Sequence, residues 1–153
     1  MIVRLHDTER DAIGRALQDV LMTLIDLSLI GKHAHWNVVG PSFRSLHRQL
    51  DEMVDVWRDA ADIVGERIAA LGLSPDGRTE TVAARTPLAS VAGGPQSDSS
   101  LVTSLTAILT DAVGLICERT ARIEDLDAVT ADLLHGISAT LEEQLWMMRV
   151  QGA

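Results

Sequence analysis

The sequence predicts an all-α protein in which four long helices form one bundle and a long crossover joins the second helix to the third. Apolar residues recur at helical spacing in four long segments. The composition agrees, with 46% hydrophobic residues, 3% aromatic residues and only four prolines. Connections are short within each pair of segments and long between the pairs, which is typical of two antiparallel hairpins joined by a crossover. We expect residues 1–153 to form a single domain, because domains usually have about 100–200 residues.

The first two helices are expected at about residues 7–36 and 41–71. Gly40 and Pro41 separate them, since glycine suits the left-handed residue after a helix and proline suits the first turn of the next one. Gly72 ends the second helix. The core-facing residues are expected to be Ile13, Leu17, Val20, Leu24 and Leu27, followed by Phe43, Leu46, Leu50, Met53, Trp57, Ala61, Val64 and Ile68.

The last two helices are expected at about residues 100–126 and 130–150, with Thr130 as the N-cap of the fourth. A linker at 73–99, rich in Gly, Pro, Ser and Thr, is long enough to run the length of a bundle, and residues 79–85 could add a short helix to it. The core-facing residues are expected to be Leu101, Leu105, Ile108, Ala112, Leu115 and Ile123, followed by Leu134, Ile137, Leu141, Leu145 and Met148.

Charge and composition limit the classes of function. The net charge of −9 disfavours nonspecific binding to phosphate backbones, which depends on cationic side chains, and favours a cationic partner or substrate. Cys117 is the single cysteine, and its apolar helical context predicts a buried, inert thiol. We identify no signal-peptide pattern at the start and no apolar run long enough to span a membrane. We therefore expect a soluble protein of the cytoplasm with no membrane partner. This expected location includes the nucleoid.

Five residues could carry the chemistry: His35, His47, Asp51, Asp62 and Glu66. Two imidazoles and three carboxylates suit a ferrous ion. With His47 set to zero, the four residues of the second helix fall between about 0° and 100° around its axis, whereas its apolar stripe is centred near about −80°. A metal site here would therefore lie on an outer or inter-subunit surface. On spacing alone, a solvated acidic helix face remains the alternative.

Segments across most of the chain keep the order and spacing of ligand-type residues of one known family. With them, the chain resembles the Dps family (DNA-binding proteins from starved cells) of the ferritin superfamily. No Glu-x-x-His pair occurs, which disfavours classical ferritins and bacterioferritins. The segments are Lys32 to Gly40, Phe43, Leu46 and His47, Asp51 and Glu52, Asp62 to Arg67, Leu71 and Gly72, Thr130 to His135, and the region of Trp146.

The resemblance implies a ferritin-like bundle that assembles as a homo-oligomer, a hollow shell of twelve subunits. It implies a ferroxidase centre at each two-fold interface, with His35, His47 and Asp51 from one subunit and Asp62 and Glu66 from its mate. The expected activity is oxidation of ferrous iron, preferably by hydrogen peroxide, followed by mineralisation of ferric iron inside the shell, which protects against oxidative damage. Iron is the expected metal, and no haem is expected.

Further acidic residues have expected roles in this scheme. Glu52 and Asp55 lie on the same side of the second helix and are candidates for nucleating the mineral, and Asp59 is a weaker one. Asp127 and Asp132 lie near the start of the fourth helix and could line pores through which iron enters.

Other conspicuous side chains have simpler interpretations. Trp36 could donate electrons to the site, but a packing role is expected. Trp57 and Trp146 are expected in the core. His33 and His135 are expected to be hydrogen-bonded or solvent-facing rather than ligands.

Direct DNA binding is not expected. DNA-binding members of the family commonly use flexible, lysine-rich tails. Here the first fifteen residues contain Arg4, Arg10 and Arg15, whose positive charges are balanced by three acidic residues. Only residues 151–153 are expected after the fourth helix. The alternative functions are a DNA-condensing stress protein with secondary iron binding, and a structural oligomer that lacks catalysis.

Overall fold

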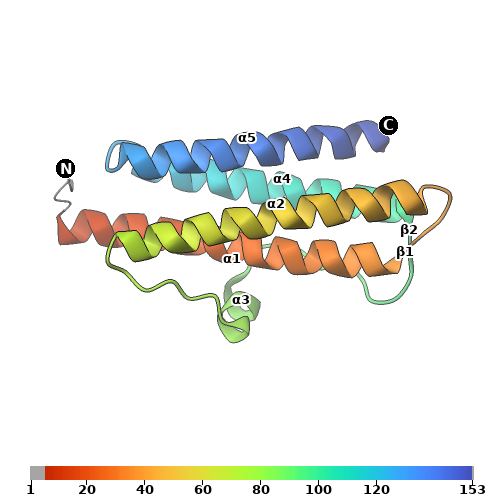
Figure 1. Ribbon diagram of the computed structural model, residues 1–153, viewed down its shortest axis with the longest axis horizontal. Coiled ribbons are helices and arrows are strands. Elements are labelled where there is room, and N and C mark those ends of the chain that lie inside the picture. Colours follow the sequence, from red (N-terminus) through yellow and green to blue (C-terminus); the bar gives the residue numbers. More distant parts are fainter. Residues whose placement is uncertain (1–5, 153) are drawn as a thin grey trace.

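The computed structural model describes residues 6–152, and Arg4 and Ala153, which entered the expectation about the tails, lie outside the described residues. Four long helices form two antiparallel hairpins that pack side by side, as Figure 1 shows, with a short helix standing beside the first hairpin. This confirms the all-α, ferritin-like architecture. The long helices are α1 (Asp7–Asn37), α2 (Phe43–Ala70), α4 (Asp98–Ile123) and α5 (Ala128–Gln151).

The core lies where the apolar stripes of the four helices meet, and most of the predicted stripe residues are buried there. Trp57 is fully buried, and its indole Nε1 donates a hydrogen bond of 2.7 Å to Oε1 of the buried Gln144. Gly31 allows α1 to approach α2 closely, because a Cβ there would lie 2.5 Å from the Trp57 ring and 2.6 Å from Val54. Phe43 departs from the prediction and is 44% exposed, since it lies at the very start of α2.

The turn between α1 and α2 is tied to the start of α4. Strand β1 (Val38–Val39) pairs in parallel with strand β2 (Gln96–Ser97), a two-residue ladder that the sequence did not predict. Gly40 has a φ of 127°, a left-handed conformation that favours glycine. The backbone N–H of Ser42 donates to Oδ2 of Asp98 at 2.7 Å. These contacts fix the position of His35, two residues before the end of α1.

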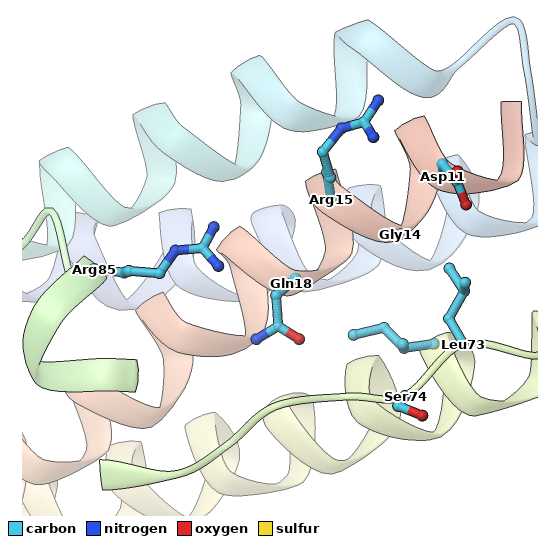
Figure 2. A pocket seen from close by; sticks show the side chains of 8 residues that line it. Asp11, Gly14, Arg15, Gln18, Leu73, Ser74 and Arg85 are labelled. Atoms are coloured by element: carbon cyan, nitrogen blue, oxygen red, sulfur yellow. The ribbon is translucent and has the colours of Figure 1, made fainter. Parts of the chain in front are cut away.

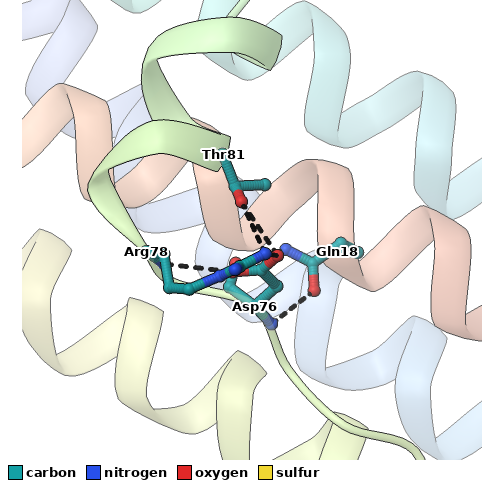
Figure 3. A network of polar contacts seen from close by, with 4 residues as sticks. All are labelled: Gln18, Asp76, Arg78 and Thr81. Atoms are coloured by element: carbon teal, nitrogen blue, oxygen red, sulfur yellow. Dashed lines mark hydrogen bonds and ion pairs between the residues drawn. The ribbon is translucent and has the colours of Figure 1, made fainter.

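The long linker is anchored to the bundle along its course. The predicted short helix is present as α3 (Thr79–Arg85) and contacts α1. Figure 3 shows the polar network at its start, where Gln18 of α1 holds the backbone of Asp76 through two hydrogen bonds of 2.7 and 2.9 Å. The Asp76 carboxylate accepts hydrogen bonds from Arg78 and Thr81, and the side-chain and backbone bonds from Arg78 hold the pKa of Asp76 well below its usual range.

Three helix starts differ from the predictions. Helix α2 begins at Phe43, so Pro41 lies in the turn before the helix and not in its first turn. Asp127, not Thr130, is the N-cap of α5, because its side chain accepts a hydrogen bond of 3.2 Å from the N–H of Val129. Thr130 lies buried within the first turn instead. Helix α4 begins at Asp98, with Ser97 as its N-cap, so it starts two residues earlier than expected.

Three further expectations are wrong. Cys117 is exposed rather than buried, and Trp146 is 62% exposed rather than part of the core. Helix α4, with 26 residues and a mean hydropathy of 1.7 over its most apolar stretch, does have the length and composition to span a membrane. Those properties alone are weak evidence for a span, because the core helix of a bundle shares them, and α4 supplies Leu101, Leu105 and Leu109 to the core.

Candidate functional site

Two of the predicted ligands, His35 at the end of α1 and His47 near the start of α2, are in direct contact. Their rings stack with centroids 3.6 Å apart and an angle of 18° between planes. Nδ1 of His35 lies 2.7 Å from the backbone oxygen of His47, and Nδ1 of His47 lies 2.8 Å from the backbone oxygen of His35. A carbonyl oxygen only accepts, so each Nδ1 carries the proton. Each Nε2 then presents a lone pair, the form in which a neutral imidazole binds a metal ion.

Asp51 lies one helical turn after His47 and is half exposed. Its carboxylate forms an ion pair with Lys32, which lies one turn before His35 on α1. This hydrogen bond from Lys32 holds the pKa of Asp51 below its usual value against the opposing effect of burial, and the charge of Lys32 acts in the same direction as the hydrogen bond. Asp51 is therefore a carboxylate at neutral pH. The pairing of Lys32 with Asp51 was not predicted from the sequence, although the spacing of three residues between Lys32 and His35 placed both on the same helix face.

The other two predicted ligands, Asp62 and Glu66, are exposed on α2 and lie far from the first three within the chain. Fifteen residues separate His47 from Asp62, and at a rise of about 1.5 Å per residue this is about 22 Å. Metal–ligand bonds are only about 2 Å long, so one ion cannot join the two groups within a subunit. Consistently, no three His, Cys, Asp or Glu side chains converge on a metal position within residues 6–152.

His47 and Asp51 line one open surface depression, and Asp62 and Glu66 line another. The depression beside His47 and Asp51 has a volume of about 500 Å³ and is strongly polar, and the one beside Asp62 and Glu66 has a volume of about 520 Å³ and a largely apolar floor. The first is lined by Phe43, Arg44, His47, Arg48, Asp51, Glu52 and Asp55, and the second by Leu21, Ile25, Arg58, Ala61, Asp62, Gly65, Glu66, Ala69, Pro75 and Gly77.

A third pocket, of about 320 Å³, lies between α1, the linker and α3, away from all five ligands. Figure 2 shows Arg15 and Gln18 of α1 and Arg85 of α3 at its wall, with Asp11 at one end. Arg85 is already paired with Asp19 at 3.2 Å. This pocket offers a single carboxylate and no histidine, so its side chains do not suit a metal ion.

The predicted nucleation and pore residues differ in how freely they meet solvent. Glu52, Asp55 and Asp132 are exposed. Asp127 has a side chain only 8% exposed, caps α5 and pairs with Arg67 at 2.6 Å. Burial raises the pKa of Asp127, but hydrogen bonds from Thr130 and Arg67 outweigh it and hold the pKa below its usual value. Asp127 therefore has a structural role, and the pore prediction now depends mainly on Asp132.

The remaining histidines and Trp36 can be compared with the roles expected from the sequence. Nε2 of His33 lies 2.9 Å from the backbone oxygen of Ala92, so His33 is hydrogen-bonded as predicted. His135 is exposed, with its Nε2 3.3 Å from a Glu124 carboxylate oxygen. Trp36 is 71% exposed, so the expectation that it packs is wrong within this subunit.

Comparisons with known proteins identify the family of this chain. The ferritin-like domain family matches residues 14–151. A DNA protection during starvation protein of Mycolicibacterium smegmatis is 35% identical over 153 residues, which covers 95% of this chain and 79% of that protein. A crystal form of Mycobacterium smegmatis Dps superposes with a TM-score of 0.94 at 32% identity, covering 99% of this chain and 92% of that one.

A third relative carries iron in its description. The structure of Dps from Microbacterium arborescens in the high iron form has a TM-score of 0.90 and 27% identity, covering 95% of each chain. The family model, the sequence identity and the fold thus agree, and the chain belongs to the ferritin-like family and, within it, to the Dps family.

Proposed function

We propose that this protein oxidises ferrous iron at sites shared by two copies of the chain and stores the ferric product. The spacing along α2 carries the proposal. Asp51 follows His47 by four residues, and Asp62 precedes Glu66 by four residues. A two-fold axis that sets α2 antiparallel to its copy and places His47 opposite Glu66 of the partner subunit therefore also places Asp51 opposite Asp62 of the partner subunit.

The donor atoms suit ferrous ions. His35 and His47 present Nε2 lone pairs, because their Nδ1 protons are held by backbone carbonyls. Asp51 is ionised beside Lys32. Bringing the two exposed carboxylates of the partner subunit against Asp51 concentrates negative charge, which is unfavourable unless a cation lies between them. Ferrous ions satisfy that requirement and accept mixed imidazole and carboxylate ligands.

The reaction balances with two ferrous ions and one hydrogen peroxide. Each ferrous ion gives up one electron, the oxygen–oxygen bond of peroxide breaks, and two protons are taken up to form two water molecules. Because both electrons leave together, little hydroxyl radical escapes. The choice of peroxide over dioxygen follows from the family resemblance. It fits a role in stress, since the M. smegmatis relative is named for DNA protection during starvation.

Storage requires an enclosed space, and we propose the twelve-subunit shell that the family resemblance implies. Glu52 would nucleate mineral and Asp132 would line an entry path, because both are exposed carboxylates that are not among the five proposed ligands. The relative from Microbacterium arborescens is described in a high iron form, which supports iron as the cargo. The cytoplasm, where ferrous iron and peroxide meet, is the proposed location.

Direct DNA condensation is the second candidate, and the names of the relatives favour it. The charge balance disfavours it, since this chain has 13 basic and 22 acidic side chains and phosphate contacts need Lys or Arg. We therefore propose that any protection of DNA is indirect, through removal of iron and peroxide.

Anaerobic mixing of the protein with ferrous iron, followed by peroxide, tests the proposal through ferric absorbance. We expect oxidation faster than in buffer, faster with peroxide than with dioxygen, and ferric iron that stays soluble with the protein. A His47→Ala variant should lose this activity, whereas Asp111→Asn, which changes an exposed carboxylate of α4 outside the proposed site, should keep it. A natural protein no faster than buffer would refute the proposal.

A further inference from the structure

We propose that Asp55 pairs with Arg58 of the partner subunit, twice about the two-fold axis, and that this reciprocal ion pair sets the register of the two α2 helices. The inference rests on the shared site proposed above. Asp55 lies four residues after Asp51, which itself lies four residues after His47. In the same way, Arg58 lies four residues before Asp62, which lies four residues before Glu66. The register that aligns the ligands therefore places Asp55 opposite Arg58 of the partner subunit.

Both side chains lie on the correct face of the helix. On the scale that sets His47 to zero, Asp55 lies at about 80° and Arg58 at about 20°, on either side of the mean direction of the four α2 ligands at about 50°. Both are exposed, and within residues 6–152 neither side chain forms an ion pair or a hydrogen bond. Each charge is therefore available to a second copy of the chain.

The two surface depressions end in complementary charges. Asp55 closes the depression of His47 and Asp51, and Arg58 lies in the depression of Asp62 and Glu66. When two copies meet, each of the first depressions faces one of the second. The carboxylates that face each other need iron between them, so the Asp55–Arg58 pairs supply the attraction that brings the halves together before iron arrives.

An ion pair within one helix is the competing arrangement, because the two residues are three apart. The structure does not form it, although it forms such local pairs elsewhere: Arg10 with Asp7 at 3.0 Å, and Arg122 with Glu118 one turn away. The pairing of Asp55 with Arg58 of the partner subunit also requires one particular register of the two α2 helices. If one helix shifted by one turn so that Asp55 faced Asp62 of the partner subunit, the two carboxylates would repel each other and oppose the shift.

Charge reversal separates the two arrangements in metal-free protein. In homodimers of Asp55→Arg, two pairs of arginines oppose each other, and in homodimers of Arg58→Asp, two pairs of aspartates do. Each variant alone should dissociate at protein concentrations at least tenfold higher than the natural protein, as measured by sedimentation velocity. Mixed one to one, the two variants form heterodimers in which both pairs are again opposite in charge, and assembly should return to natural strength. The double variant, Asp55→Arg with Arg58→Asp, should assemble as well.

Controls make every outcome decisive. Asp111→Arg reverses an exposed charge on α4, outside the α2 face, and should leave assembly unchanged. Single variants that assemble like Asp111→Arg would overturn the inference. A double variant that recovers while the mixture does not would also overturn it, because only a pair within one helix behaves that way. If either reversal lowered helicity, the neutral variants Asp55→Asn and Arg58→Gln would take its place, and both must weaken assembly. Because assembly is measured without iron, its failure is distinct from a failure of ferrous oxidation.

Discussion

Two inactive variants, His47→Ala and Asp62→Ala, should regain activity when they are refolded together. In a dimer of either variant, both shared sites lack one ligand. A mixed dimer has one site with both defects and one site with none, because His47 and Asp62 of the same site come from different subunits. Random pairing at equal amounts makes half of the dimers mixed, so about a quarter of all sites should be intact, and ferrous oxidation should reach about a quarter of the natural rate.

The assay is peroxide-dependent ferric absorbance after co-refolding, with assembly checked by sedimentation. A mixture of His47→Ala with His35→Ala is the matched control. Both defects then lie in the same half of the site, so every site in a mixed dimer remains broken and no activity should return. Full assembly without any rescue of the first mixture would refute the shared site and point to centres built within one subunit.

Three other predictions concern packing, the linker and nucleic acid. Gly31→Ala should destabilise the fold by about 1–3 kcal/mol in urea unfolding, because the new Cβ would lie only 2.5 Å from the Trp57 ring. Gly136→Ala should not destabilise the fold, because no atom lies within 4 Å of a Cβ there, and equal unfolding midpoints for the two variants would contradict this prediction. The folded-state pKa of Asp76 lies below its unfolded value, so its hydrogen bonds stabilise the linker at a pH above the unfolded pKa and are lost as the pH falls through the folded pKa. An Arg78→Gln variant should raise the pH at which Asp76 protonates, as measured by NMR titration of its carboxyl group. An unchanged titration midpoint would argue against Arg78 as the cause. The protein should not retard duplex DNA at about 0.15 M salt with a chelator present, since phosphate neutralisation needs Lys or Arg; clear retardation at low micromolar protein would reveal a basic surface patch.

The helices and most of the core were predictable from the sequence, because the apolar residues repeat at the helical period over long segments. The wrong predictions of burial concern residues that lie next to a buried residue in the sequence but on the solvent-facing side of the helix. Trp146 follows the buried Leu145 and lies about 100° further around α5, which turns it to the surface. Cys117 follows the buried Ile116 in the same way. Asp127 and Thr130 can both cap a helix, and the sequence alone did not decide between them.

The five candidate ligands were proposed from the sequence as a set, since their types and spacing suit iron and their angular separation from the core stripe indicated an outer surface. Their role as ligands stays a prediction. Their fine arrangement was not predictable from the sequence. The reciprocal hydrogen bonds between His35 and His47, and the pairing of Lys32 with Asp51, depend on how α1 and α2 lie against each other. The two-residue ladder that joins β1 to β2 connects segments almost sixty residues apart, and such short strands have no periodic signal.

Anomalous diffraction from crystals soaked in ferrous iron tests the central claim most directly, because it locates the metal and identifies the subunit of each ligand. The account predicts iron bound by His47 and Asp51 of one subunit together with Asp62 and Glu66 of the partner subunit, and the same arrangement repeated about the two-fold axis. Iron bound only by residues of a single subunit, or iron elsewhere with His47 and Glu66 left without metal, would contradict it.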